Sequence, residues 1–181
     1  MLRRWRRLDE PGLEVFRLIP TDEGFLATSS IVHAGADPFD VRYHWSLDKD
    51  WRTKRVHLDL VAAVSRSLDI ERAGDASWRI DGRPRPDLDG SAEVDLSATP
   101  FSNTLAIRRM AGATGELIAV YVALPGLSVA PSQQRYEAID ENRWRYVDLG
   151  VAYGFTAVVA LDADGLVSCY EGLFEALADA P

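Results

Sequence analysis

Residues 39–47 read FDVRYHWSL, and apolar and polar side chains alternate along the whole stretch. One set of alternating positions is apolar: Phe39, Val41, Tyr43, Trp45 and Leu47. The other set is polar: Asp40, Arg42, His44 and Ser46. Successive side chains of a β-strand point to opposite faces of the sheet, so a period of two predicts an antiparallel strand with one buried face.

The same alternation recurs along the chain, at 55–60, 68–72, 77–81, 142–149 and 154–161. Turn-forming segments rich in Gly, Asp and Pro separate these stretches, at 20–24, 72–75, 81–87, 110–115 and 162–165. Many short strands with such punctuation predict an all-β (or β-rich α+β) protein of about twelve or more strands. Twist curls or splits an open sheet beyond roughly ten strands, so we expect a large antiparallel sheet rolled into a partial barrel or spiral β-roll.

Helix is expected to be scarce, limited to one or two turns within 61–68 and a short helix over 173–178. No shift in composition marks a linker, and no repeat of fixed period occurs. The sequence therefore predicts a single β-roll domain over residues 1–181. A rolled sheet of this size can enclose more room than its own side chains fill, which predicts a cavity.

Composition and charge exclude several classes of protein. The net charge is −8, whereas nucleic-acid binders need clustered basic residues to neutralise phosphates, so no nucleic-acid partner is expected. Cys169 is the only cysteine, which rules out an internal disulfide and fits a reducing compartment. No apolar run approaches the roughly 18 residues of a membrane helix, so we expect a soluble, cytoplasmic protein without a transmembrane segment. Nothing in the sequence selects an oligomeric state.

Residues 95–109, DLSATPFSNTLAIRR, place polar groups among apolar ones. Pro100 cannot donate to a sheet ladder and predicts a corner, after which a strand is expected to resume near Asn103. On a strand, Arg108 and Arg109 would point to opposite faces, so one guanidinium would lie on the apolar side and need an anionic partner. That partner is either Asp95, in an ion pair that fastens the corner, or a bound ligand.

Known catalytic and metal-binding motifs are not found. The three histidines lack metal-site spacing, and there is no nucleophile elbow and no glycine-rich phosphate loop, so no metal, cofactor or catalytic nucleophile is expected. Glu93 and Asp95 share one face of a predicted strand. They could form an acid–base pair, or they could face solvent or cross-strand arginines.

The segments LDG at 88–90 and VDLSATPFSNTLAIRR at 94–109 are similar to the signature of the putative glycolipid-binding family of bacterial proteins. Further similar segments are DWRTKRV at 50–56, WRIDG at 78–82, QRY at 134–136 and the stretch 154–174. The resemblance extends over essentially the whole chain. It implies a β-rich domain whose sheet spirals around a hydrophobic cavity, and it places the family's motif at these positions of this chain: Trp51, Arg52, Arg55, Asp89, Gly90, Asp95, Pro100, Asn103, Thr104, Arg108, Arg109, Arg135 and Tyr136.

The leading hypothesis is a non-enzymatic protein that binds an amphiphile, of which a glycolipid is one example, inside the rolled sheet. The expected ligand-binding residues are Arg55, Asp95, Asn103, Arg108, Arg109, Arg135 and Tyr136. One alternative is an enzyme on a small hydrophobic or sugar-linked metabolite, with Asp95 or Glu93 as acid or base. The other is a structural or interaction domain with a packed interior. A cavity would separate the first two hypotheses from the third.

Overall fold

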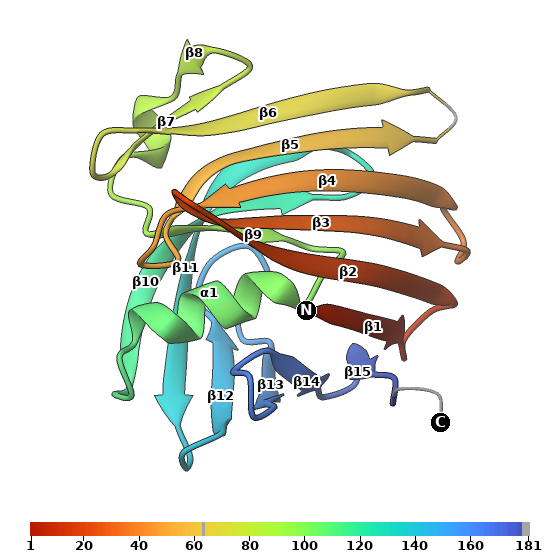
Figure 1. The fold of residues 1–181 in the computed structure, drawn as a ribbon, viewed down its shortest axis with the longest axis vertical. Coiled ribbons are helices and arrows are strands. Elements are labelled where there is room, and N and C mark those ends of the chain that lie inside the picture. The colour runs from red at the N-terminus through yellow and green to blue at the C-terminus, as the bar shows by residue number, and fades with distance from the viewer. Residues whose placement is uncertain (63, 179–181) are drawn as a thin grey trace. The chain divides into compact units, whose positions relative to one another are not determined.

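The computed structural model describes residues 1–62 and 64–178 (Figure 1). It contains one α-helix within these residues, α1 (Phe101–Arg109), and one 3-10 turn (Pro86–Leu88). The strands are β1 (Leu2–Arg7), β2 (Gly12–Thr21), β3 (Gly24–His33), β4 (Phe39–Leu47), β5 (Thr53–Val61), β6 (Arg66–Ala73), β7 (Ser77–Ile80), β8 (Arg83–Pro84), β9 (Glu93–Leu96), β10 (Gly115–Ala123), β11 (Ser128–Ala138), β12 (Arg143–Asp148), β13 (Thr156–Leu161), β14 (Val167–Tyr170) and β15 (Phe174–Ala176).

The chain divides into two compact units. Unit 1 comprises Met1–Pro86 and the chain from Ala176 onward, and unit 2 comprises Asp87–Glu175. In unit 1 the strands are hydrogen-bonded in the order β8-β7-β6-β5-β4-β3-β2-β1, and in unit 2 in the order β15-β14-β13-β12-β11-β10-β9. Within each unit neighbouring strands are antiparallel, except for the parallel pair β9 and β10.

The prediction of a large, rolled antiparallel sheet with little helix is confirmed by this strand content and pairing. The prediction of a single domain remains a prediction.

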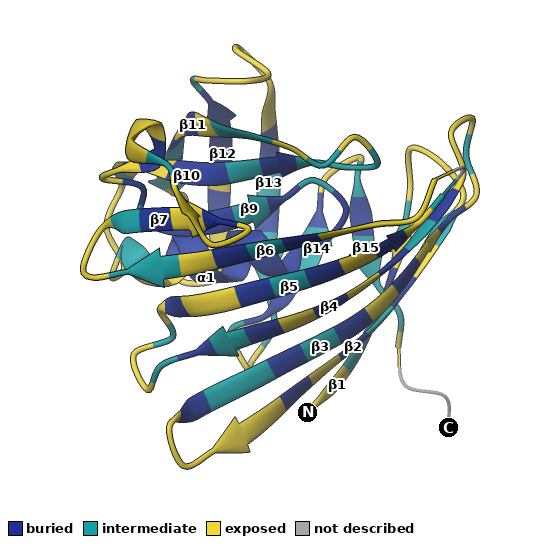
Figure 2. Ribbon diagram, turned by 90° about the horizontal axis from the view of Figure 1, so that it is seen from above, coloured by how far each residue is buried: buried dark blue, intermediate teal, exposed yellow. Residues whose placement is uncertain are grey.

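The alternation of apolar and polar residues determines which side chains form the core of unit 1. All five apolar positions of β4 are buried, and its polar positions are exposed or half-buried, as Figure 2 shows for the neighbouring strands as well. Two aromatic side chains of this core have hydrogen-bonded polar groups: Trp45 Nε1 donates to Thr53 Oγ1 at 2.8 Å, and the Tyr43 hydroxyl donates to a carboxylate oxygen of Glu14 at 3.0 Å. Burying these rings removes a large apolar area from water without leaving the two donors unpaired.

The segment 101–109 corrects the strand that we expected to resume near Asn103, because it forms helix α1 instead. Residues Phe101–Ile107 are buried, so the helix is held by its surroundings rather than by an amphipathic pattern. Its polar side chains are hydrogen-bonded in the interior. Ser102 Oγ accepts from Leu96 N at 2.9 Å, and Thr104 Oγ1 accepts from Val167 N at 3.2 Å. Tertiary contacts here outweigh the weak helix propensity of Ser, Asn and Thr.

Of the two smaller helix predictions, the one over the tail is wrong, and the one within 61–68 includes a residue that the structure does not describe. The tail over 173–178 forms strand β15 rather than a helix, and Leu177 N then donates to the carbonyl of Arg4 at 2.8 Å. In the segment 61–68, Val61 ends β5 and Arg66 begins β6, while residue 63 lies outside the described residues.

Candidate functional site

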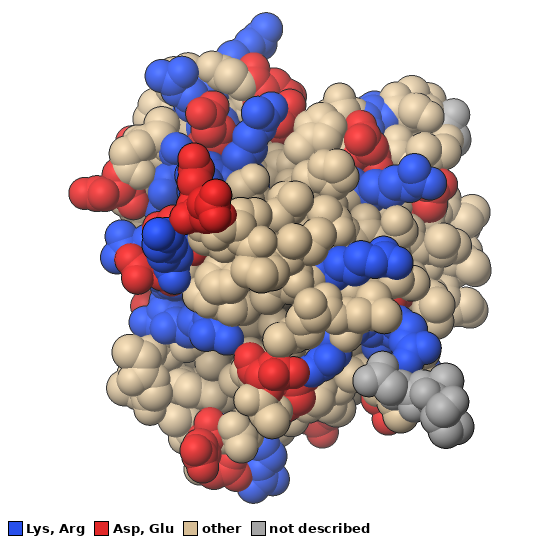
Figure 3. Space-filling model, viewed as in Figure 1, with Lys and Arg blue, Asp and Glu red and all other residues tan. Residues whose placement is uncertain are grey.

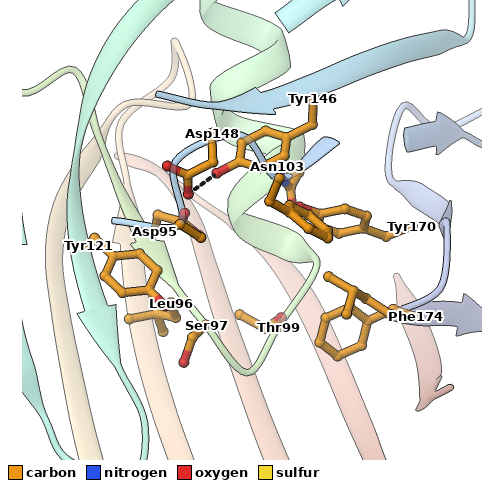
Figure 4. A pocket seen from close by; sticks show the side chains of 13 residues that line it. Asp95, Leu96, Ser97, Thr99, Asn103, Tyr121, Tyr146, Asp148, Tyr170 and Phe174 are labelled. Atoms are coloured by element: carbon orange, nitrogen blue, oxygen red, sulfur yellow. Dashed lines mark hydrogen bonds between the residues drawn. The ribbon is translucent and has the colours of Figure 1, made fainter. Parts of the chain in front are cut away.

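Unit 2 contains a cavity of about 220 Å³. It lies where the ends of β9 and β12 meet the start of α1 and the loop between β12 and β13. Figure 4 shows the side chains that line it: Asp95, Leu96, Ser97, Thr99, Asn103, Tyr121, Tyr146, Asp148, Ala152, Phe155, Tyr170, Leu173 and Phe174. Asp95 and Asp148 lie on one side, and Tyr170 and Phe174 face them across the space (Figure 4).

Asp148 is held rigidly at the end of β12. Its side chain is buried, at 4% exposure, and accepts the backbone N–H of Gly150 at 2.7 Å and the hydroxyl of Tyr146 at 3.0 Å. Tyr146 and Asp148 are two residues apart on one strand, so they share a face. Gly150 packs so closely against Ser132 that a Cβ there would lie 2.5 Å from the Ser132 hydroxyl oxygen. The absence of a side chain at Gly150 therefore allows the turn that presents its N–H to Asp148.

Asp95 comes from the edge strand β9 and is half-buried. Gln134 Nε2 donates to its carboxylate at 2.6 Å. Burial raises the pKa of Asp95 to about 6, and the negative charge of Asp148 acts in the same direction, while hydrogen bonds from Gln134 and Ser102 oppose the rise. This carboxyl group therefore loses its proton near pH 6 rather than near pH 4.

Asn103 links the cavity to the buried interior. Its Nδ2 donates to the Tyr136 hydroxyl at 3.0 Å, and that hydroxyl donates to Gln134 Oε1 at 3.3 Å. Because Gln134 in turn donates to Asp95, a continuous chain of hydrogen bonds runs from Asn103 to Asp95. Tyr136 is 1% exposed and does not line the cavity, so its hydroxyl contacts Asn103 and Gln134 behind the cavity wall.

The aromatic rings of the cavity form a connected cluster. The Tyr170 ring centroid lies 5.9 Å from Tyr146, 6.4 Å from Phe155 and 6.3 Å from Phe174. Burial, followed by the charge of Asp95, raises the pKa of Tyr121, Tyr146 and Tyr170 above the ordinary value of a phenol. These hydroxyls consequently stay protonated and act as neutral hydrogen-bond groups.

Two of the predicted ligand-binding arginines lie in exposed ion pairs. Arg55, in unit 1, makes a two-pronged contact with Asp69 at 2.9 and 2.6 Å. Arg135 lies 3.1 Å from Glu137 and 3.8 Å from Glu116. Acidic and basic side chains are interspersed on the face shown in Figure 3, as such pairing requires. Neither arginine lines the cavity of unit 2.

The two consecutive arginines end helix α1, where positive charge is favourable because the helix carbonyls point toward them. Arg109 lies 3.5 Å from the buried carboxylate of Glu93, so the expected pairing with Asp95 is corrected to Glu93. Arg108 donates to the carbonyl of Asp164 at 3.3 Å. Neither arginine lines the cavity.

Of the predicted site residues, the structure thus brings together Asp95 and Asn103 in the cavity, with Tyr136 behind them. Sequence reasoning missed Asp148, Tyr146 and Tyr170. A signal for the first two was present in RWRYVD at 143–148, where Trp144, Tyr146 and Asp148 occupy alternate positions and so share a face.

Two other features are absent from the described ranges 1–62 and 64–178. No group of three or more His, Cys, Asp or Glu side chains is placed to hold a metal ion. No helix in the same residues combines the length and the apolarity that crossing a bilayer requires.

Comparison with known proteins connects this chain to a family. The sequence profile of the family described as "Putative glycolipid-binding" matches residues 2–176. A crystal structure of a DUF1089 family protein from Pseudomonas aeruginosa is similar, with a TM-score of 0.80 and 28% sequence identity over 91% of this chain and 92% of that chain. No protein of curated function matches. The profile covers almost the whole chain, and the chain therefore belongs to the putative glycolipid-binding family.

Proposed function

We propose that this protein binds an amphiphilic molecule, with a glycolipid as the leading class, and that the polar head of this molecule enters the cavity of unit 2. The observation that carries the proposal is the division of the cavity wall. Asp95 and Asp148 lie on one side, with Tyr121 and Tyr146 next to them, and the rings of Tyr170 and Phe174 face the two carboxylates across the space (Figure 4). Sugars present hydroxyl donors at their edges and apolar C–H groups on their faces, so this division matches both kinds of surface.

Cavity size supports the head group as the part that enters. At about 220 Å³ the space is smaller than the roughly 300–1,000 Å³ of sites that enclose a drug-sized ligand. One ring or another small group fills it, and an alkyl chain would extend past the rim. Phe155 lines the cavity and is 38% exposed, and its loop neighbours Val151 and Tyr153 are 53% and 81% exposed. These side chains offer apolar surface for the start of that chain.

In this proposal Asp95 and Asn103 contact the head group, and Tyr136 positions them. Arg55, Arg108, Arg109 and Arg135 act in ion pairs and hydrogen bonds of the fold. The cavity also favours a binding protein over the alternative of a structural domain with a packed interior. We further propose a cytoplasmic, non-enzymatic protein, a location that the single free cysteine supports.

Binding of octyl glucoside below its critical micelle concentration tests the proposal. We expect NMR shift changes at the residues that line the cavity. We also expect the Ala152→Trp variant to weaken binding at least tenfold, because Ala152 is exposed in its loop and a larger side chain there fills the cavity without disturbing the core. Shift changes away from unit 2, or equal binding by Ala152→Trp, would contradict the proposal.

A second candidate function is acid–base catalysis on a sugar-linked metabolite, favoured by the raised pKa of Asp95 beside a second carboxylate. Glu93, the other carboxylate considered for this role, is buried against Arg109 and does not line the cavity. Incubation of the protein with octyl glucoside followed by mass spectrometry separates the candidates. Release of octanol that is lost in Asp95→Asn favours the enzyme, and recovery of intact octyl glucoside favours the binding protein.

A further inference from the structure

The cavity of unit 2 carries negative charge without a basic residue in its wall. Asp95 and Asp148 both line it, and among the described lining residues there is no lysine, arginine or histidine. The donors that hold these two carboxylates are neutral: the amide of Gln134, the backbone N–H of Gly150 and the hydroxyl of Tyr146. Hydrogen bonds of this kind fix the carboxylates in place but leave their charge uncompensated.

Rings surround the remaining space. Tyr146, Phe155, Tyr170 and Phe174 form the connected cluster described above, with centroid separations of 5.9–6.4 Å between contacting rings, and Tyr121 completes the lining beside Asp95. Aromatic faces attract cations through their quadrupole, and several rings around one small space form the cage that binds ammonium groups. The rings and the carboxylates thus favour the same kind of guest by two independent physical effects.

We propose that the head group recognised by this cavity carries a positively charged ammonium group, as in an amino sugar or a quaternary ammonium lipid. The inference rests on the proposed function, because it takes the cavity to be the ligand site. A bound ammonium compensates the charge of Asp148 and Asp95 and contacts the surrounding rings. A sulfate or phosphate head would instead face two carboxylates with no basic side chain in the wall, so the site discriminates against anionic amphiphiles.

The titration of Asp95 agrees with this assignment. Burial raises the pKa of Asp95 to about 6, and the charge of the nearby Asp148 acts in the same direction, so below about pH 6 the Asp95 carboxyl group holds a proton. Other ionisable groups that face Asp95 are the tyrosines at 121, 136, 146 and 170, whose pKa values are raised and which stay neutral. An incoming ammonium replaces the proton, and its affinity should rise as the pH increases through about 6.

Three probes with the same alkyl chain and different heads test the inference: octyltrimethylammonium, octyl glucoside and octyl sulfate, each titrated below its critical micelle concentration by isothermal calorimetry at pH 7.5. We expect the ammonium probe to bind at least tenfold more tightly than the sulfate probe. Asp148→Asn should reduce the affinity for the ammonium probe about tenfold and change that for octyl glucoside less than threefold. Glu141→Gln, an exposed acid in the same unit, removes the same net charge and should leave all three affinities unchanged.

The outcomes separate the two proposals. If the sulfate probe binds within threefold of the ammonium probe, or if Asp148→Asn and Glu141→Gln behave alike, the ammonium assignment is wrong while amphiphile binding stands. If none of the three probes binds to the wild-type protein, the proposed function fails, and the assignment fails with it. Circular dichroism checks that Asp148→Asn is folded, and Asp95→Asn takes its place in the comparison if it is not.

Discussion

Replacing Asp95 by asparagine should remove a pH dependence from the stability of this protein. The pKa of Asp95 is raised from 3.8 to about 6 in the folded chain, so the folded state binds this proton more tightly than the unfolded state does. Between about pH 4 and pH 6 unfolding therefore releases a proton, and the free energy of unfolding falls as the pH rises. The stabilisation is complete below the unfolded pKa and is lost once the pH passes the folded one.

The size of this effect follows from the two pKa values. A difference of one in pKa corresponds to about 1.4 kcal/mol, so the rise from 3.8 to about 6 corresponds to about 3 kcal/mol. Asp95 is half-buried at the cavity wall, and contact with solvent reduces the penalty on its charged form. We expect the unfolding free energy of Asp95→Asn, relative to wild type, to increase by about 2–3 kcal/mol between pH 4 and pH 7.5.

Urea unfolding of both proteins at several pH values, followed by circular dichroism, measures the difference. NMR of carboxyl-labelled aspartate reports the pKa directly, and the resonance missing in Asp95→Asn identifies the group. Glu141→Gln, which removes an exposed carboxyl group of the same unit, serves as the control. A stability difference between Asp95→Asn and wild type that stays constant with pH, or a measured pKa near 4, would refute the reasoning.

Three further variants test the packing. Arg109→Gln should lower the unfolding free energy by about 3 kcal/mol, because it removes this ion pair from the buried Glu93 carboxylate. The added change Glu93→Gln should recover part of the loss. If urea unfolding shows that the effects of the two changes are additive, the pairing is wrong. Phe101→Ala should cost about 3–5 kcal/mol because this ring at the start of α1 is fully buried, so a melting temperature unchanged in calorimetry would contradict the described packing. Gly24→Ala should destabilise the β2–β3 turn by at least about 1 kcal/mol, since Gly24 has φ +144 and an added Cβ would overlap the Leu47 carbonyl; wild-type protection of the hairpin amides in hydrogen exchange would disprove this.

The strands could be predicted from the sequence because each carries its burial pattern locally. In FDVRYHWSL every second residue is buried, and the alternation alone is enough to place β4 and its core face. The same is true of RVHLDL, where Val56, Leu58 and Leu60 are buried in β5. The turn residues between these stretches predict hairpins, and the strands of a hairpin are antiparallel. The pairing could therefore be predicted without information from distant parts of the chain.

Helix α1 was not predicted because the first half of its sequence is unfavourable for a helix, although Leu105, Ala106, Arg108 and Arg109 in its second half are good helix formers. Ser102, Asn103 and Thr104 are weak helix formers, and the stabilising contacts come from Leu96, Tyr136 and Val167, which are distant in sequence or outside the helix. The wrong strand assignment also affected the prediction for Arg108 and Arg109. On a strand their side chains would point to opposite faces, whereas both lie in the last turn of the helix.

A cavity was expected from the rolling of the sheet, but the residues that line the cavity of unit 2 were mostly not predicted. Asp95 and Asn103 stood out because they are polar in an apolar stretch. Asp148 is brought beside Asp95 by the order β12-β11-β10-β9, in which two strands separate theirs. Such an encounter depends on the register of every intervening pair, which no local pattern contains.

The parallel pairing of β9 with β10 bears on how unit 2 assembles. Strands β10 to β14 of this unit pair antiparallel with one another and are joined by short connections. Each of these pairs can therefore form from its turn at a small entropic cost of loop closure. Strand β9 can only join after the chain from 97 to 114, including α1, has crossed over and docked. We therefore expect β9 to be the last strand of this unit to acquire amide protection during refolding. The cavity, to which β9 contributes Asp95 and Leu96, would then form in the final folding step of unit 2.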